Sequence, residues 1–509
     1  METKTAAIEM RNITKRFGPV LANDKVWLNI YRGEILALLG ENGSGKTTLM
    51  NMLSGIYFPD EGEIKIDGKE VVIRSPKDAF DNGIGMIHQH FKLVDVLTAA
   101  ENIVLGLPGK LDLKAASAKI REICDKYGFS VDPTQKIYDM SVSQKQTVEI
   151  VKVLYRSADI LILDEPTAVL TPQETDKLFA VLRNMRNDGK AIVIITHKMH
   201  EVEALSDRVA ILRHGQFIGD MLTKDTNAQE MTNMMVGHAV SLNIDRPDPV
   251  DPKPRVEVKG LTVRSVDGII KLDDVSFTAN SGEILGIAGI SGCGQKELLE
   301  AIAGLQTVES GSISYIEDDG SREELVGKDP LSIAELGVSL SFVPEDRLGM
   351  GLVGNMNLAD NMMLRSFRRG KSTFTDRRSP RALAESVVQE LSVSTPSVDT
   401  PVRRLSGGNV QKVLVGREIA SAPTVLLTAY AVRGLDIHSS YTIYDLINRQ
   451  KKAGVAVIFV GEDLDVLLEL CDRILVLCGG KVSGIVPGRG AEKREVGMMM
   501  TKLGGQSHE

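Results

Sequence analysis

Short apolar runs recur along this chain and end in glycine-rich or acidic loops. Three of them lie in the first half: Glu34–Leu39 (EILALL), Ile160–Leu163 (ILIL) and Ala191–Ile195 (AIVII). Runs of this length predict buried strands. Thr48–Leu53 is expected to open a helix after the first run, and Lys110–Met140 is expected to be helical. The alternation of strand, loop and helix favours an α/β fold with a mixed sheet core.

The pattern occurs twice. Val26–Ile35 (VWLNIYRGEI) matches Val275–Ile284 (VSFTANSGEI), 249 positions further on. Asp207-Arg208 matches Asp472-Arg473, 265 positions further on, so the second copy carries insertions between about residues 300 and 405. A repeat over such a distance, with strand–loop–helix signals in both copies, predicts two copies of one α/β domain.

One proline-rich stretch separates the copies. Asp245–Pro254 reads DRPDPVDPKP, with four prolines in ten residues. Proline at this density favours extended polyproline II and disfavours helices and central strands. The sequence therefore predicts a first domain over 1–244, a semi-rigid linker over 245–254 that spans roughly 30 Å, and a second domain over 255–509.

Composition narrows the function. Hydrophobic residues make up 43% and charged residues 25% of 509, as in soluble globular proteins. The net charge of -8 and the 4% of aromatic residues argue against a nucleic-acid binder. Four scattered cysteines without a CxxC pair indicate reduced thiols. The N-terminus lacks the apolar core of a signal peptide, and no apolar run approaches the ~18–20 residues of a membrane span.

A phosphate-binding loop follows the first predicted strand. Gly40–Thr47 reads GENGSGKT, which fits the P-loop pattern. The glycines let backbone N–H groups point at phosphate oxygens, Lys46 supplies a charge for the β- and γ-phosphates, and Thr47 can ligate Mg²⁺. The nucleotide-binding candidates here are Gly40, Glu41, Asn42, Gly43, Ser44, Gly45, Lys46, Thr47 and Thr48.

Polar residues also follow the other two predicted strands. Asp164 and Glu165 end the second, where Asp164 would hold Mg²⁺ and Glu165 would polarise the attacking water. His197 follows the third, where it could contact the γ-phosphate. Read alone, the acids could face solvent and His197 could be a surface residue. Beside the P-loop, all three predict phosphoryl chemistry.

The second copy has lost these groups. Gln295 stands where Lys46 stands, and Lys296 takes the place of Thr47. Ala429 and Tyr430 replace the two acids. A different motif survives there: Leu405–Asn409 reads LSGGN, whereas the first copy reads MSVSQ. Ser406 can cap the following helix and bind phosphate together with the N–H groups of Gly407 and Gly408.

The order of P-loop, Gln89, Ser141 motif, acidic pair and His197 resembles the ATP-binding cassette (ABC) ATPases, over nearly the whole chain and twice. This resemblance implies two tandem P-loop NTPase domains, each with a helical subdomain. It also implies ATP held between the P-loop of one domain and the signature of the other. Gln89 would reach Mg²⁺ and Phe17 would stack on adenine, although Phe17 could equally be a core residue.

Sorting the motifs by site leaves one site complete. The site made of the first P-loop and the second signature keeps every expected motif. In the site made of the second P-loop and the first signature, each of these motifs is altered. We therefore expect one hydrolytic site per chain, within an intramolecular dimer of the two cassettes. Its expected residues are Lys46, Gln89, Asp164, Glu165, His197 and Ser406–Gly408.

Tandem cassettes with a degenerate second copy resemble the ATP-binding subunits of bacterial sugar and nucleoside importers. That resemblance implies two transmembrane permease subunits, an extracytoplasmic solute-binding protein and a place on the cytoplasmic face of the membrane. Met86–Gly106 resembles the purine nucleoside branch, and His88, His90 and Phe91 are expected to line the groove for a permease helix. Simple sugars remain open as cargo. A soluble ATPase acting on ribosomes or DNA, and an ATP sensor without a membrane partner, are the alternatives.

Overall fold

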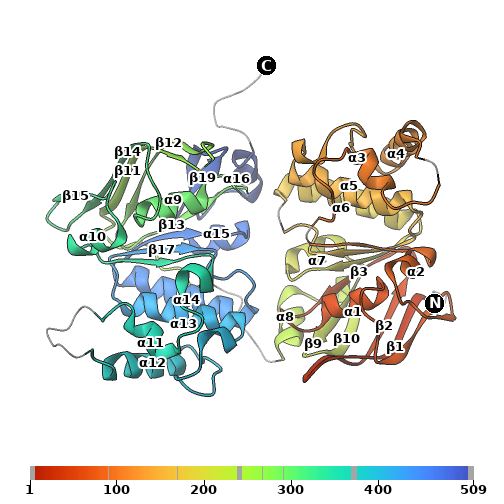
Figure 1. The fold of residues 1–509 in the computed structure, drawn as a ribbon, viewed down its shortest axis with the longest axis horizontal. Coiled ribbons are helices and arrows are strands. Elements are labelled where there is room, and N and C mark those ends of the chain that lie inside the picture. The colour runs from red at the N-terminus through yellow and green to blue at the C-terminus, as the bar shows by residue number, and fades with distance from the viewer. Residues whose placement is uncertain are drawn as a thin grey trace. The chain divides into compact units, whose positions relative to one another are not determined.

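The computed structural model describes residues 6–89, 91–109, 111–168, 170–237, 244–265, 267–290, 292–367 and 375–501. The chain divides into two compact units, Met1–Ser241 (unit 1) and Leu242–Glu509 (unit 2). Strands and helices alternate in both units, so the predicted α/β fold is confirmed (Figure 1).

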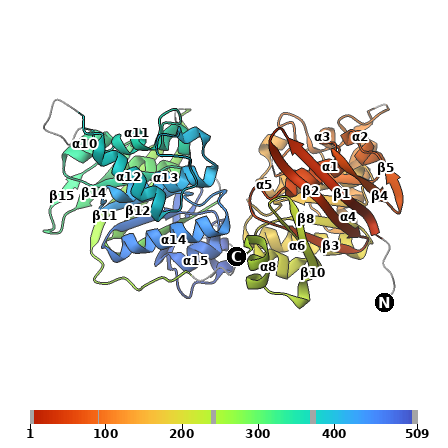
Figure 2. The same cartoon turned by 90° about the horizontal axis from the view of Figure 1, so that it is seen from below.

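Unit 1 contains two sheets. Its strands are β1 (Ala6–Phe17), β2 (Val20–Tyr31), β3 (Glu34–Leu39), β4 (Glu61–Ile66), β5 (Lys69–Val71), β6 (Ile84–Ile87), β7 (Ile160–Asp164), β8 (Ala191–Ile195), β9 (Arg208–Arg213) and β10 (Gln216–Leu222). An antiparallel sheet has the order β2-β1-β4-β5 (Figure 2), and a six-stranded sheet has the order β10-β9-β3-β8-β7-β6. The six-stranded sheet is mixed, because β10 pairs antiparallel with β9 whereas the other neighbours are parallel.

Helices cover this larger sheet and build a separate cluster. They are α1 (Lys46–Leu53), α2 (Pro76–Asp81), α3 (Ala99–Val104), α4 (Leu113–Tyr127), α5 (Val142–Tyr155), α6 (Pro172–Asn187), α7 (Met199–Leu205) and α8 (Ala228–Val236). Leu49 of α1 is buried in one core with Ile8 of β1 and Leu36 of β3, so α1 joins the two sheets. Helices α3, α4 and α5 share their own buried core, which forms the predicted helical subdomain.

The expectation of a helix throughout Lys110–Met140 is wrong. Helix α4 ends at Tyr127 because Gly128 adopts a left-handed conformation, with φ 86°. The only other helical element in the described part of that range is a short 3₁₀ turn, Ile137–Asp139.

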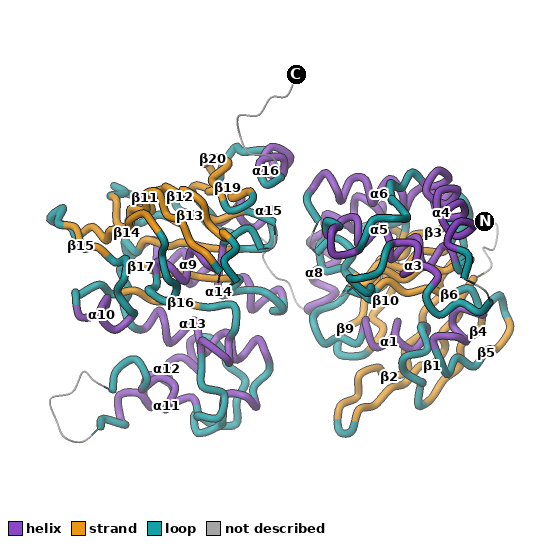
Figure 3. The backbone as a smooth tube through the Cα atoms, turned by 45° about the horizontal axis from the view of Figure 1, so that its top comes forward, coloured by secondary structure: helices purple, strands orange, loops and turns teal. Residues whose placement is uncertain are grey.

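Unit 2 repeats the architecture. Its strands are β11 (Pro254–Arg264), β12 (Ile270–Asn280), β13 (Ile284–Ala288), β14 (Ser310–Ile316), β15 (Arg322–Glu324), β16 (Leu340–Val343), β17 (Val425–Ala429), β18 (Ala456–Val460), β19 (Arg473–Cys478) and β20 (Lys481–Pro487). Its helices are α9 (Gln295–Ile302), α10 (Pro330–Glu335), α11 (Leu358–Met363), α12 (Arg378–Glu390), α13 (Gly407–Ala420), α14 (Ile437–Lys452), α15 (Leu464–Leu470) and α16 (Lys493–Met499). The sheet order β16-β17-β18-β13-β19-β20 matches β6-β7-β8-β3-β9-β10 strand for strand, so the sequence repeat is a structural repeat. Figure 3 shows the strands and helices of both units.

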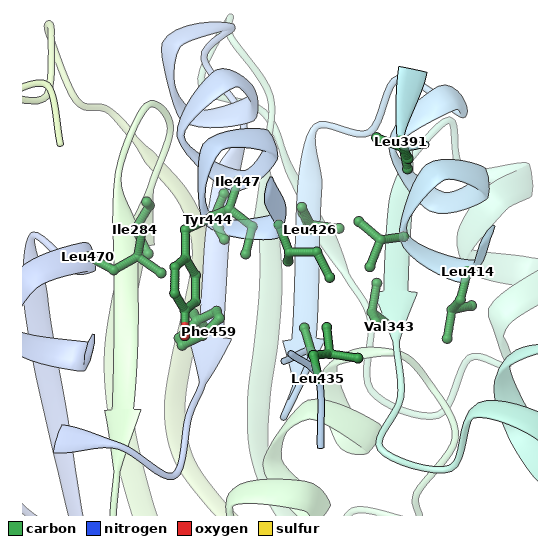
Figure 4. Close-up of a cluster of buried hydrophobic side chains, with 14 of the residues drawn as sticks. Ile284, Val343, Leu391, Leu414, Leu426, Leu435, Tyr444, Ile447, Phe459 and Leu470 are labelled. Atoms are coloured by element: carbon green, nitrogen blue, oxygen red, sulfur yellow. The ribbon is translucent and has the colours of Figure 1, made fainter. Parts of the chain in front are cut away.

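Apolar packing fixes the end of β17, where unit 2 carries its counterparts of the acidic pair. Leu426 of β17 and Phe459 of β18 pack against Tyr444 and Ile447 of α14 (Figure 4). On the opposite face, Leu427 packs in the core that contains α9. A strand buried on both faces is a rigid support for the residues that follow it.

The proline-rich segment is attached to unit 2. Arg246 is buried, and its guanidinium donates to the carbonyl oxygens of Leu468, at 3.3 Å, and Cys471. Lys451 donates to the carbonyl of Pro247. Pro254 is the first residue of β11, a position that tolerates proline. The segment is therefore anchored along unit 2, and its role as a linker stays a prediction.

No helix within the described residues combines the length and the apolar character that crossing a bilayer requires.

Candidate active site

The loop between β3 and α1 is built on glycine. Gly40 and Gly45 have φ of 156° and 94°, which disfavour other residues. A Cβ atom would lie 2.3 Å from the carbonyl oxygen of Leu212 if placed on Gly40, and 2.3 Å from that of Ala22 if placed on Gly45. The loop can keep this tight curl only with glycine at both positions.

Lys46 begins α1 and is buried in the curl. Its Nζ donates to the carbonyl oxygens of Gly40, at 2.6 Å, and Glu41, at 2.9 Å. Burial lowers the pKa of Lys46, against the opposing effect of nearby Glu165. Ser44 Oγ is buried without a hydrogen-bond partner among the described residues. A buried cation and an unpaired hydroxyl in one loop fit an incoming phosphate group.

A hydroxyl and a carboxylate converge beside the loop. Thr47 Oγ1 donates to Asp164 Oδ2 at 3.2 Å, and Asp164 is the last residue of β7. Burial raises the pKa of Asp164. Oxygen ligands of this kind are those that Mg²⁺ prefers, so the pair fits a metal ion bound to nucleotide phosphates.

Glu165 joins two other predicted residues. Its Oε2 accepts from Gln89 Nε2 at 3.0 Å, and its Oε1 lies 3.0 Å from His197 Nδ1. The His197 hydrogen bond lowers the pKa of Glu165, which favours its ionised form. Glu165 also has φ 47°, a strained backbone value for a residue other than glycine. Backbone and side chain are therefore held at one place beside Asp164.

One cavity of about 260 Å³ collects these groups. It is lined by Val20, Leu21, Ala22, Asn42, Gly43, Ser44, Gly45, Lys46, Thr47, Thr48, Gln89, Asp164, Glu165 and Ile195. Gly40 and Glu41 contribute through their contacts with Lys46, and His197 contributes through Glu165. The predicted residues of the first copy, apart from Phe17, thus lie in or directly against one cavity.

Phe17 lies outside the lining. It ends β1 with its side chain partly exposed and its ring edge-on to Tyr57, 5.1 Å between centroids. Val20, its partner in the register of β1 and β2, does line the cavity, so Phe17 sits at the border. Adenine stacking on Phe17 stays a prediction.

Sequence reasoning missed the wall formed by the start of β2. Leu21 and Ala22 line the cavity, and the next residue, Asn23, is buried and donates to the carbonyl of Gly45 at 3.3 Å. No motif marks these residues, because two neighbouring apolar residues such as Leu21 and Ala22 occur in most buried strands. An asparagine directly after the apolar residues Val20–Ala22 is the one signal the sequence offers.

The second copy keeps the loop without its charge. Gln295 is buried and donates to the carbonyl of Ile290 at 3.1 Å, as Lys46 does to Glu41. Lys296 does not replace it: its exposed ammonium pairs with Glu300 at 3.7 Å.

The two signature helices have equivalent starts. Ser406 caps α13 and accepts from Asn409 Nδ2 at 2.8 Å. Ser141 caps α5 and accepts from the N–H of Gln144 at 3.3 Å. The caps therefore survive in both units. Only α13 begins with two glycines, which leave backbone N–H groups accessible to a phosphate.

A buried lysine in a glycine curl, beside paired acids that a histidine and a glutamine orient, suits one kind of reaction. It can neutralise a triphosphate and direct water at its terminal phosphorus. Unit 1 is accordingly a P-loop nucleoside triphosphatase. The sequence profile of the family described as "ABC transporter" matches residues 23–168 and 272–428, more than half of the chain. The chain belongs to this family and carries two of its cassettes, so it is an ATPase whose hydrolysis drives transport.

Relatives extend over the full length. The "Nucleoside import ATP-binding protein NupA" of Lactococcus lactis is 42% identical and covers 99% of both chains. The "Glucose import ATP-binding protein TsgD13" of Haloferax volcanii is 40% identical, covering 98% of this chain and 96% of the relative. The "Guanosine import ATP-binding protein NupO" of Bacillus subtilis is 40% identical and covers 97% of both.

Replacing Lys46 by Ala should weaken ATP binding to the full chain by roughly 30-fold or more, because a buried charge facing the phosphates is lost. Gln295→Ala, at the equivalent position of unit 2, should leave the affinity unchanged. Titration with a fluorescent ATP analogue measures both. Equal affinities for the Lys46→Ala variant and the unmodified protein would contradict the assignment of this loop.

Proposed function

We propose that this protein supplies the energy for import of a nucleoside through partner membrane proteins, with purine nucleosides favoured over simple sugars. The printed names of NupA and NupO support a nucleoside, and the Met86–Gly106 segment resembles the same branch. The name of TsgD13 keeps a sugar as the second candidate. The same names disfavour an ATPase acting on ribosomes or DNA.

One observation carries the catalytic part of the proposal: the reactive groups converge in unit 1 and are missing from the matching places of unit 2. Lys46, Asp164 and Glu165 share one cavity, whereas Gln295, Ala429 and Tyr430 offer neither cation nor carboxylate. We therefore propose one hydrolytic ATP site per chain. The glycine start of α13 would close over the unit 1 P-loop and contact the γ-phosphate.

The residues divide the work of hydrolysis. Lys46 would leave its loop carbonyls and neutralise the β- and γ-phosphates. Glu165, ionised and oriented by Gln89 and His197, would polarise the attacking water. Mg²⁺, when bound by Thr47, Asp164 and Gln89, would neutralise developing phosphate charge.

The proposed partners follow from the same comparison. Two transmembrane permease subunits would bind this chain at the cytoplasmic face of the membrane, and an extracytoplasmic binding protein would deliver the cargo. Co-expression with neighbouring permease genes, followed by affinity purification, tests this directly. Recovery of both permeases with ATP-dependent nucleoside uptake is the expected result. Recovery with ribosomes, or a chain that binds ATP but no membrane protein, would contradict it.

The segment after Gln89 is a candidate contact for a permease. Phe91 is partly exposed, and the adjacent Lys92 is held on α5 by Lys152, whose Nζ donates to the Lys92 carbonyl at 2.9 Å. His88 is partly buried, which lowers its pKa, and His90 lies outside the described residues. The segment is thus fixed on the helical subdomain at Lys92, directly after Phe91.

Phe91→Ala should reduce uptake by roughly 10-fold while ATP binding stays normal, because an aromatic anchor in an interface costs about 2 kcal/mol on truncation. Phe58→Ala, which removes another exposed aromatic ring of unit 1, is the control and should transport normally. Uptake and ATP affinity are measured on the same preparations. Normal uptake by the Phe91→Ala variant would remove this segment from the interface.

A further inference from the structure

In the altered site of unit 2, a positively charged side chain connects two neighbouring loops, where unit 1 uses a negatively charged one. In unit 1 the carboxylate of Glu165 joins Gln89 and His197. The corresponding residues of unit 2 are Tyr430, Glu345 and Glu462.

In unit 2 a guanidinium joins the two equivalent positions. Arg433 Nη1 donates to Glu345 Oε1, and Arg433 Nε lies 2.9 Å from Glu462 Oε1. The guanidinium carbon lies 5.9 Å from the ring centre of Tyr430. Burial, together with Glu345 and Glu462, raises the pKa of Tyr430 to about 12, so the phenol stays neutral beneath the cation.

This link belongs to unit 2 alone. The unit 1 counterpart of Arg433, 265 positions earlier, is Ala168, which cannot form an ion pair. Its partners are also within the chain, so the link forms without nucleotide or metal. Each pair is partly exposed and individually weak. One guanidinium shared by two carboxylates is nevertheless fixed in direction, since both bonds must be satisfied together.

A second arginine extends the link to the signature. Arg347 Nη2 donates to the backbone carbonyl of Arg433, and Arg347 Nη1 donates to the carbonyl of Gly407 at 3.2 Å. Arg347 is two residues after Glu345, and Asp346, between them, caps the helical turn Arg347–Gly351 by accepting from the N–H of Gly349 at 2.8 Å. The contacts form a closed ring through Glu345, Arg433 and Arg347, with Gly407 attached.

The attachment is close. A Cβ atom on Gly407 would lie 3.3 Å from Arg347 Nη1, so the guanidinium packs directly on the start of α13. Burial, and then the charge of Arg433, lowers the pKa of Arg347. A partly desolvated donor of this kind holds the Gly407 carbonyl in one orientation, which also fixes the N–H of Gly408 in the same peptide plane.

We infer that Arg433 and Arg347 are positioning residues for ATP hydrolysis, which hold the Gly407–Gly408 peptide in the orientation whose N–H binds the γ-phosphate at the P-loop of unit 1. The inference rests on the proposed function, because it assumes that the α13 signature serves that site. The altered nucleotide site of unit 2 then acts as a permanent support, and its loss of catalytic acids leaves room for the arginine.

The test compares Arg347→Ala and Arg433→Ala in the complete transporter. Because the proposed site binds ATP through the P-loop of unit 1, we expect kcat to fall roughly 10-fold while the affinity for ATP and the Tm stay unchanged. Arg433→Lys should recover part of kcat, because an ammonium can still pair with one carboxylate. Arg347→Lys should recover less, since a single ammonium cannot reach both carbonyls in the planar geometry of arginine. Arg381→Ala breaks an exposed ion pair with Asp399 elsewhere in unit 2 and is the matched control.

The outcomes separate this inference from the proposed function. Normal kcat in both alanine variants would overturn the inference, as would a loss that only follows a lower Tm or recovers equally in both lysine variants. If Ser406→Arg is inactive while Arg347→Ala and Arg433→Ala are normal, the inference fails and the composite site stands. If Ser406→Arg is fully active, the composite site itself fails. Should an alanine variant not fold, the partial loss of kcat expected of its lysine variant is measured in its place, and a normal kcat there would overturn the inference.

Discussion

Replacing Glu165 by Gln is expected to reduce ATP hydrolysis by the assembled transporter roughly 10³-fold, with ATP still bound. Glutamine preserves the size of the side chain and can keep contacts with Gln89 and His197, which now meet the two Glu165 oxygens at 3.0 Å. It lacks the negative charge that polarises water. The rate of inorganic phosphate production should therefore fall. The affinity for ATP should stay unchanged, because Lys46 and the P-loop are not altered.

The matched control is Tyr430→Phe. Tyr430 occupies the place of Glu165 in unit 2 and shares its unusual backbone, with φ 52° against 47°. Removing its hydroxyl should leave hydrolysis unchanged if the altered nucleotide site of unit 2 holds no catalytic group. Unchanged turnover in Glu165→Gln would refute the assignment of Glu165. A large loss in Tyr430→Phe would show that the altered nucleotide site of unit 2 contributes chemistry.

The second large effect is expected from Ser406→Arg. The substitution places a bulky side chain at the start of α13, where the N–H groups of Gly407 and Gly408 would face the γ-phosphate. Hydrolysis should fall roughly 10²-fold, as it does when one group that stabilises the transition state is removed. Binding of ATP to the P-loop of unit 1 should persist, since that loop lies wholly in the other unit.

Ser141→Arg separates this effect from a loss of stability. Ser141 caps α5 as Ser406 caps α13, and either substitution removes a cap worth ~1 kcal/mol. The two variants should therefore lose similar stability, measured as Tm, but only Ser406→Arg should lose hydrolysis. An equal fall in both rates would mean that the asymmetry between the signatures has no catalytic meaning.

Local signals predicted the core of unit 1. Residues Glu34–Leu39 and Ala191–Ile195 form β3 and β8 with the predicted bounds. An apolar run buried on both faces and a glycine curl are each set by neighbouring residues, so both are visible in sequence. Thr47 and Asp164 lie far apart in the chain, and their pairing was predictable through chemistry, because both were expected to hold the same Mg²⁺.

Contacts between distant segments were not visible. Arg246, predicted to lie in a semi-rigid linker, is buried against Leu468 and Cys471 because guanidinium donors reach carbonyls that no local pattern marks. The bonds of Arg433 likewise join three separate loops. Ala22 lines the cavity, and Asn23 donates to the carbonyl of Gly45, through the fold of β2 alone. Such contacts depend on how far a long side chain extends toward segments that are distant in sequence, and the hydrophobic pattern does not predict them.

We propose that the unit 1 P-loop pairs with the unit 2 signature of the same chain. Cysteines at Asn42 and Ser406 (Asn42→Cys with Ser406→Cys), in a Glu165→Gln background, test it by oxidative cross-linking with and without Mg-ATP. The native cysteines Cys124, Cys293 and Cys471 are buried, and protein without the added cysteines supplies the background. The account predicts an ATP-dependent disulfide within one chain, and none between Asn42→Cys and Ser141→Cys. A disulfide between Asn42→Cys and Ser141→Cys joining two chains would contradict it.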